Sequence, residues 1–134
     1  MTPGGDRITR VEEQIRREVA AVLTRAVADP ASANVTVLWA KVARDLSFAD
    51  IYVSIFGDEA AVAAGMRALQ RCRAFVQQEV AARIRLRKTP HLRFRLDEQY
   101  RSAMRVYEIL NELEKDEENA GDAGDAGAEG SGRA

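Results

Sequence analysis

The sequence predicts an α+β domain followed by a short polar tail. Stretches with apolar residues every three or four positions, typical of amphipathic helices, are interleaved with three shorter stretches typical of β-strands. The predicted order is helix, strand, strand, two helices, strand and helix. A length of 134 residues, 46% of them hydrophobic, fits one globular domain with a buried core.

The first predicted helix covers residues 6–28. Its apolar side chains recur at helical steps: Ile8, Val11, Ile15, Val19, Val22, Leu23 and Ala26. Either Asp6, or Thr9 together with Glu12 at the spacing of a capping box, fits the start of this helix. Pro30 marks its end, because proline disfavours helical geometry in the residue before it.

The three predicted strands differ in how clearly they show a buried face. Residues 48–56 and 91–97 alternate between apolar and polar side chains. Their apolar positions are Ala49, Ile51, Val53, Ile55, Leu92, Phe94 and Leu96. Residues 35–43 are apolar on both sides, so alternation alone does not identify their core face. Asp45 is expected to hold the turn between the first two strands by accepting backbone N–H groups.

The second half of the chain contains the longest helical pattern. Residues 59–86 would exceed about 40 Å as one helix, which predicts a break near the middle, although no Gly or Pro marks it. A last helix is predicted over residues 98–115. We therefore expect a folded domain at residues 6–115. Residues 116–134 contain no large apolar residue and are expected to form a disordered acidic tail.

The net charge of −1 conceals a strong asymmetry. Residues 1–107 carry 18 basic and 12 acidic residues, whereas residues 108–134 carry 2 and 9. Ten basic residues follow closely on one another: Arg71, Arg73, Arg83, Arg85, Arg87, Lys88, Arg93, Arg95, Arg101 and Arg105. A basic body of this kind favours a polyanionic partner, most often nucleic acid. A solvated helix face is the alternative interpretation.

The side chains needed for enzymatic chemistry are scarce. The single cysteine, Cys72, excludes an intramolecular disulfide and argues against a cysteine zinc site. The single histidine, His91, lies about 20 Å along a strand from Asp97, too far for joint acid–base catalysis. We expect no catalytic residue, metal, cofactor or small-molecule substrate. No apolar run is long enough for a membrane span and no secretory signal is seen, so we expect a cytoplasmic protein.

Four sequence segments together indicate a family. They are residues 7–15 (RITRVEEQI), Asp29 with Pro30, residues 42–54 (VARDLSFADIYVS) and residues 86–97 (LRKTPHLRFRLD). In this order and spacing they resemble ribosome-binding factor A, a family of bacterial small-subunit assembly factors. The resemblance extends over residues 6–113.

The resemblance implies a type II KH-like fold: a three-stranded mixed sheet with helices on one face and a further helix at the C-terminus. The family has a kink between its two central helices instead of the Gly-x-x-Gly loop of other KH domains. That kink corresponds here to Cys72, Arg73 and Ala74, with Ala74 at a position where many relatives have Gly.

The resemblance and the charge pattern together favour an RNA-binding band. Its candidate residues are Arg73, Arg83, Arg85, Arg87, Lys88, Arg93 and Arg95. The helix macrodipole explains one or two cations near a helix end, but not this many. Arg93 and Arg95 lie on the same face of a strand and would repel each other unless an anion lies nearby.

Trp39 leaves two alternatives. Aligning the first hairpin with the family pattern places these residues on the core face: Leu38, Ala40 and Val42. Trp39 and Lys41 then lie on the open face, near Tyr52. Trp39 either stacks on an unpaired base or lies half-buried at the sheet edge or under the C-terminal helix.

The resemblance implies a monomeric, non-enzymatic assembly factor. It would bind the small (30S) ribosomal subunit and its 16S rRNA during late maturation, and would aid processing of the rRNA 5′ end and growth in the cold. The alternative is a KH-like interaction module that binds another RNA or an acidic protein. The acidic tail is either a solvating extension or a competitor of RNA for the basic face.

Overall fold

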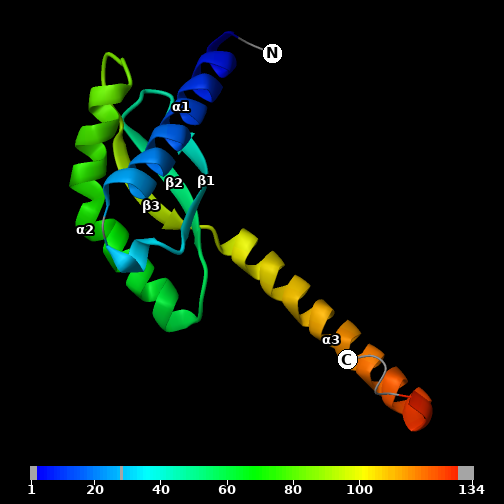
Figure 1. Cartoon of the computed structure of the whole chain (residues 1–134). Helices are drawn as coiled ribbons and strands as arrows, with labels where there is room; N and C mark the ends of the chain where they lie inside the picture. The colour runs from blue at the N-terminus through cyan, green and yellow to red at the C-terminus, as the bar shows by residue number, and fades with distance from the viewer. Residues whose placement is uncertain (1–2, 28, 130–134) are drawn as a thin grey trace. The chain divides into compact units, whose positions relative to one another are not determined.

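The computed structural model describes residues 3–27 and 29–129. Its elements are α1 (Pro3–Ala26), a short 3-10 helix η1 (Pro30–Ser32), β1 (Val35–Val42), β2 (Phe48–Ile55), α2 (Glu59–Arg83), β3 (His91–Leu96) and α3 (Glu98–Glu129) (Figure 1). They divide into two compact units, residues 1–97 and residues 98–134. The predicted α+β class and element order are confirmed, with one central helix in place of two.

The sheet of the first unit is mixed. β2 lies in the centre, antiparallel to β1 and parallel to β3. The parallel pair requires a crossover connection, which α2 supplies. Along β2, Ala49, Ile51, Val53 and Ile55 are buried and the residues between them are not. Because α1 packs on β1 and α2 packs on β3, both helices cover this single face, as the sequence led us to expect.

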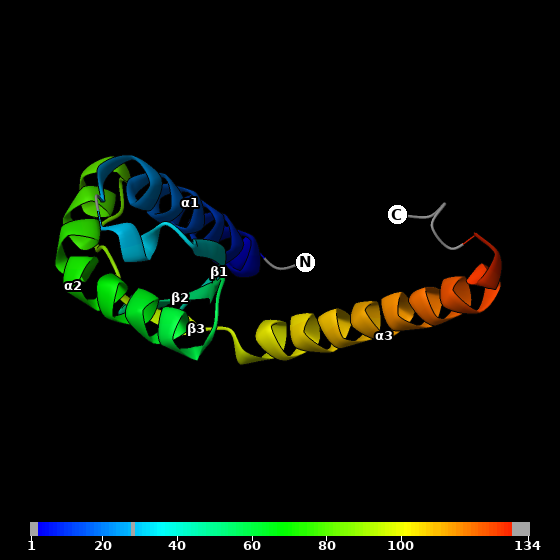
Figure 2. The same ribbon diagram turned by 60° about the horizontal axis from the view of Figure 1, so that its bottom comes forward.

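The core lies between the sheet and these two helices (Figure 2). Its largest fully buried side chains are Ile15, Val19, Val22, Ile51, Val53, Leu69, Val76, Val80 and Leu92. Each is worth about 1.5–3 kcal/mol relative to an exposed position. All residues of this hydrophobic cluster belong to the first unit, so that unit has a core of its own.

A β-bulge explains why β1 has no clear alternation in the sequence. The pairing with β2 shifts between Val37 and Trp39, which leaves Leu38 as an extra residue. Val35 and Val37 pack against the core before this point, and Ala40 and Val42 are buried after it. Leu38 itself is only half-buried, so its expected place beside Ala40 and Val42 is corrected: one inserted residue reverses which positions face the core.

The expected break in the central helix is wrong. α2 runs from Glu59 to Arg83 without interruption, including Cys72, Arg73 and Ala74, and Figures 1 and 2 show one curved ribbon. Its buried residues recur at regular helical steps: Val62, Gly65, Ala68, Leu69, Val76 and Val80. Ala74 supports this continuity, because alanine is favoured over glycine in a helix interior by about 1 kcal/mol.

The two terminal helices also differ from the sequence-based boundaries. α1 begins at Pro3, so Asp6 and Thr9 lie inside the helix instead of capping it. Proline is well suited to the first turn, because its fixed backbone angle matches the helix. α3 continues to Glu129 instead of ending at residue 115 as predicted. Elongating a formed helix is cheap, and residues 116–129 contain the helix-forming residues Ala and Glu. Residues 130–134 of the expected tail lie outside the described residues.

The first half of α3 carries several exposed apolar side chains. They are Tyr100, Met104, Val106, Tyr107, Ile109, Leu110 and Leu113. None of the helices in the described ranges is both long and apolar enough to cross a membrane.

Candidate nucleic-acid interface

The face of the sheet opposite α1 and α2 presents a mixture of aromatic and charged side chains, and we call it the outer sheet face. Strand alternation and pairing assign to it Thr36, Trp39, Lys41, Phe48, Asp50, Tyr52, Ser54, His91, Arg93 and Arg95. Three of these belong to the predicted aromatic and arginine sites: Trp39, Arg93 and Arg95. The structure therefore brings together two features that are more than 50 residues apart in the sequence.

The anion that the neighbouring arginines require is supplied by the protein itself. Arg93 binds Asp50 through two hydrogen bonds, Nε to Oδ1 at 2.7 Å and Nη2 to Oδ2 at 3.1 Å. Arg95 Nε lies 3.1 Å from the same Oδ1. Burial alone would raise the pKa of Asp50, but the hydrogen bonds and charges of both arginines outweigh it and lower the pKa. A phosphate bound at this point would compete with the Asp50 carboxylate for Arg93 and Arg95.

The aromatic residues of this face form three fixed contacts. The rings of Trp39 and Tyr52 stack with their centroids 4.2 Å apart and their planes 5° apart. The indole Nε1 of Trp39 donates to Asp97 Oδ2 at 3.0 Å. The guanidinium of Arg93 lies 3.9 Å from the centre of the Phe48 ring, within cation–π range. Within the first unit, Trp39 lies on the edge strand β1 with 43% of its surface exposed.

Two of the predicted RNA-binding residues have structural partners. Arg73 is half-buried and donates through Nη1 to Gln77 Oε1 at 3.2 Å and to the Leu92 carbonyl at 3.4 Å. Arg83 lies 3.7 Å from Glu18 Oε1 and 3.4 Å from Glu79 Oε1. These contacts connect α2 to β3 and to α1, so Arg73 already donates hydrogen bonds and part of the charge of Arg83 is compensated.

The other candidates lie on the loop between α2 and β3. Arg85, Arg87 and Lys88 are all exposed. Within the described part of the chain, Arg85 and Arg87 form neither a hydrogen bond nor an ion pair. Lys88 lies close enough to Asp45 to contribute to the lowered pKa of that carboxyl, whose main cause is the hydrogen bond from the Ser47 hydroxyl. This loop therefore offers the least compensated positive charge among the predicted residues.

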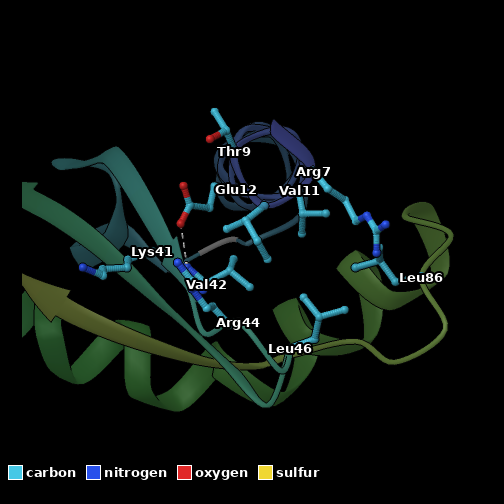
Figure 3. A pocket seen from close by; sticks show the side chains of 10 residues that line it. Arg7, Thr9, Val11, Glu12, Lys41, Val42, Arg44, Leu46 and Leu86 are labelled. Carbon is cyan, nitrogen blue, oxygen red and sulfur yellow. Dashed lines mark hydrogen bonds between the residues drawn. The ribbon is translucent and has the colours of Figure 1, made fainter. Parts of the chain in front are cut away.

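The same loop borders a groove beneath the first hairpin (Figure 3). The groove has a volume of about 650 Å³. Its apolar lining comes from Ile8, Val11, Val42, Leu46 and Leu86. Its cationic lining comes from Arg7, Lys41 and Arg44, all exposed. Leu86 links the groove to the loop, because Arg85 and Arg87 flank it.

Hydrogen bonds and an unusual backbone angle hold the segments that line this groove. Asp45 Oδ1 accepts hydrogen bonds from the backbone N (3.0 Å) and hydroxyl (2.7 Å) of Ser47, which confirms its predicted role in the turn. Leu46 adopts a positive φ of 62°, unusual for a non-glycine residue, and packs against the core from that position. Glu12 Oε2 accepts from the backbone N of Val42 at 3.0 Å and joins α1 to β1.

We refer to Arg7, Lys41, Arg44, Arg85, Arg87 and Lys88 as the basic end of the first unit. The sequence identified only the last three. The other three stand alone in the sequence among acidic or apolar neighbours, and only the fold brings α1, β1 and the hairpin turn to one place. Their common property, an exposed cation beside a groove, has no local sequence signal.

The potential nucleophile and metal ligands form no recognisable reaction centre. Burial raises the pKa of the Cys72 thiol, whose Sγ donates weakly to the Leu69 carbonyl at 3.6 Å. A thiol with a raised pKa is a poor nucleophile. Among the described residues, no three His, Cys, Asp or Glu side chains are grouped so that they could hold a metal ion.

Comparisons with known proteins agree with this fold. The family model of ribosome-binding factor A matches residues 7–110. The crystal structure of ribosome-binding factor A from Thermus thermophilus is similar with a TM-score of 0.60 and 29% identity, over 66% of this chain and 93% of that one.

Two further structures have the same fold. One is a Thermus thermophilus ribosome binding factor A model fitted into a cryo-EM map of a 30S complex (TM-score 0.54, 30% identity, 66% of this chain, 92% of that chain). The other is a Thermotoga maritima protein solved by NMR and described as a candidate ribosome binding factor A (TM-score 0.61, 25% identity, 71% of this chain, 90% of that chain). Because the family model covers nearly all of the first unit and the start of α3, the chain belongs to the ribosome-binding factor A family.

Proposed function

We propose that this chain is an assembly factor that binds the small (30S) ribosomal subunit through its 16S rRNA, in the cytoplasm, during late maturation. The family match over residues 7–110 carries the proposal. The complex of a Thermus thermophilus relative with the 30S subunit supports the choice of partner. Three exposed cations that line one groove and three more on the loop beside it give the chain a surface suited to a phosphate backbone.

The basic end acts by phosphate contact. Arginine presents a planar fork that fits phosphate oxygens, and four of the six cations are arginines. Phosphate contacts supply affinity and position, whereas the shape of the folded rRNA supplies most of the specificity. If all six cations contact phosphates, the logarithm of the binding constant falls against that of the salt concentration with a slope of about −4 to −5.

The predicted RNA-binding residues that lie outside the basic end contribute less to RNA affinity in this proposal. Arg93 and Arg95 contribute to RNA binding only as far as a phosphate competes with Asp50. Arg73 and Arg83 mainly stabilise α2 against its neighbours. The proposal therefore concentrates RNA affinity in the groove and the loop beside it.

No catalytic step is assigned to this chain. Its effect on processing of the rRNA 5′ end is indirect: binding holds an rRNA region in an immature arrangement, and separate nucleases then act on a correctly folded precursor. Support for growth in the cold follows from the same action, because misfolded RNA helices rearrange more slowly at low temperature.

Charge reversal tests the proposal. The chain is labelled at its N-terminus, and fluorescence anisotropy measures its affinity for purified small subunits. We expect Arg85→Glu with Arg87→Glu to weaken binding at least ten-fold. The matched control is Arg25→Glu with Arg67→Glu, which makes the same charge change at exposed positions away from the groove. Equal weakening by both pairs would mean that only net charge matters and would reject the basic end as the interface.

A second measurement separates RNA from protein as the partner. The subunits are digested completely with ribonuclease before the chain is added. The proposal requires binding to disappear. Binding that survives digestion would favour the alternative function, a module that recognises a protein.

A further inference from the structure

Trp39 is placed for a role that the basic end does not use. It lies on the outer sheet face in β1, and 43% of its surface is exposed. Leaving so large an aromatic side chain exposed forgoes the stability that its burial would provide. The exposed part of the indole is therefore available for contact with a ligand.

The indole ring is held rigidly although it is exposed. Tyr52, its direct neighbour across the sheet, stacks on it at 4.2 Å with the planes 5° apart. Asp97 Oδ2 accepts a hydrogen bond from Nε1 at 3.0 Å and fixes the rotation of the ring. A ring held in this way loses little conformational freedom when a ligand binds.

Within the first unit, the two sides of the indole differ in what lies beside them. β1 is an edge strand whose only strand neighbour in the described part of the chain is β2. Tyr52 lies on β2 and covers the side of Trp39 that faces the sheet. The opposite side faces outward past the edge, where a further flat ring can continue the stack.

Cations on both sides of the aromatic pair suit a ligand with phosphates. Lys41 is exposed two residues farther along β1 and on the same face. Arg95 lies next to Tyr52 on the other side of the stack, where a phosphate would compete with Asp50 for it. A planar surface between cations is the arrangement with which proteins bind single-stranded nucleic acid without strong sequence preference.

We propose that Trp39 stacks on an unpaired nucleobase of single-stranded RNA, with Lys41 beside the adjoining phosphate. The proposal rests on the proposed function, because it takes RNA as the partner, and it adds a base-binding subsite on the outer sheet face. The subsite accepts any base, since every base has a π-face. Removing the indole is expected to weaken RNA binding about ten-fold.

Trp39 is the only tryptophan in the chain, so its fluorescence reports on this subsite alone. The full chain is titrated at low salt with oligoadenylate and with an abasic sugar–phosphate oligomer of the same length. Anisotropy of a dye on each oligomer measures binding independently. We expect both oligomers to bind, but only oligoadenylate to quench the Trp39 emission strongly.

Variants separate stacking from folding. Trp39→Leu keeps an apolar side chain without a π-face, and is expected to bind oligoadenylate about ten-fold more weakly and the abasic oligomer unchanged. Trp39→Phe retains a ring and is expected to restore part of the difference. Circular dichroism spectra identical to that of the unchanged chain confirm that both variants are folded.

Three results would overturn this inference. They are equal quenching by both oligomers, unchanged oligoadenylate affinity in Trp39→Leu, and no binding of oligoadenylate at all. A Trp39 signal that responds only to subunit proteins would also overturn it, in favour of a protein contact. The proposed function is judged separately, by binding of the unchanged chain to whole small subunits.

Discussion

The side chain of Gln77 connects α2 to β3, and its loss should destabilise the first unit well beyond the average surface substitution. Nε2 donates to the Pro90 carbonyl at 2.8 Å, and Oε1 accepts from Leu92 N at 2.8 Å. Pro90 and Leu92 are both fully buried, so water does not readily replace the lost partner. In Gln77→Ala the loss of these two bonds and of the 3.2 Å bond from Arg73 Nη1, together with the two unsatisfied backbone groups, costs about 2–4 kcal/mol.

Urea unfolding followed by circular dichroism measures this loss. The neighbouring Gln78 is exposed and provides the matched control, since Gln78→Ala should change the free energy of unfolding by less than about 0.5 kcal/mol. Gln77→Glu keeps the acceptor for Leu92 and loses the donor to Pro90, so its cost should fall between the two. Equal free energies of unfolding for the Gln77→Ala and Gln78→Ala variants would refute the reasoning.

Two further predictions concern the loss of stability at acid pH and the strained turn at Gly57. Arg93 and Arg95 lower the pKa of Asp50 in the folded state. The ionised Asp50 carboxylate therefore contributes to the free energy of unfolding above its unfolded pKa of about 3.9, and this contribution is lost as the pH falls through the folded pKa. Asp50→Asn should therefore cost about 1 kcal/mol at pH 7, after discounting for partial exposure, and less as the pH is lowered below about 3.9; a cost that does not fall with pH in urea titrations would contradict this. Gly57 has a φ of 129°, and an added Cβ would lie 2.5 Å from the Cβ of Ala61. Gly57→Ala should lower the free energy of unfolding by about 1–3 kcal/mol, and an unchanged thermal midpoint would show that the turn relaxes freely.

Local pattern was sufficient for most of the fold. The alternation of β2 and β3 in the sequence matches their buried faces, since each strand has one face on the core and one face away from it. The helical spacing of α1 likewise identified Ile15, Val19 and Val22, which are fully buried. These features depend only on the repeat of each element, which neighbouring residues determine.

The missed features depend on contacts between distant residues. The bulge at Leu38 is visible only once β1 is paired with β2. The pairing of Asp50 with Arg93 joins residues on two parallel strands, whose register no local pattern encodes. The uninterrupted course of α2 was missed because its length was judged against a small domain, whereas its buried positions follow one regular helical series.

The residues of the candidate interface also fall into two groups, those predicted from the local sequence and those that only the fold brings together. Charge counting found Arg85, Arg87 and Lys88 because they are adjacent in the sequence. It did not find Arg7 and Arg44, which join them through the packing of α1 and the hairpin turn around one groove. The charge pattern also predicted Arg93 as an RNA-binding residue but did not reveal that Asp50 is its ion-pair partner. Asp50 lies 43 residues away in the sequence, so it does not affect the local charge.

The most direct test of the central claim is co-sedimentation of the purified chain with separated small and large ribosomal subunits over a series of salt concentrations. We expect the chain to pellet with the small subunit and not with the large one. It should be released as the salt concentration rises, because counterions replace its phosphate contacts. Equal pelleting with both subunits, or pelleting with the small subunit that salt does not reduce, would contradict it.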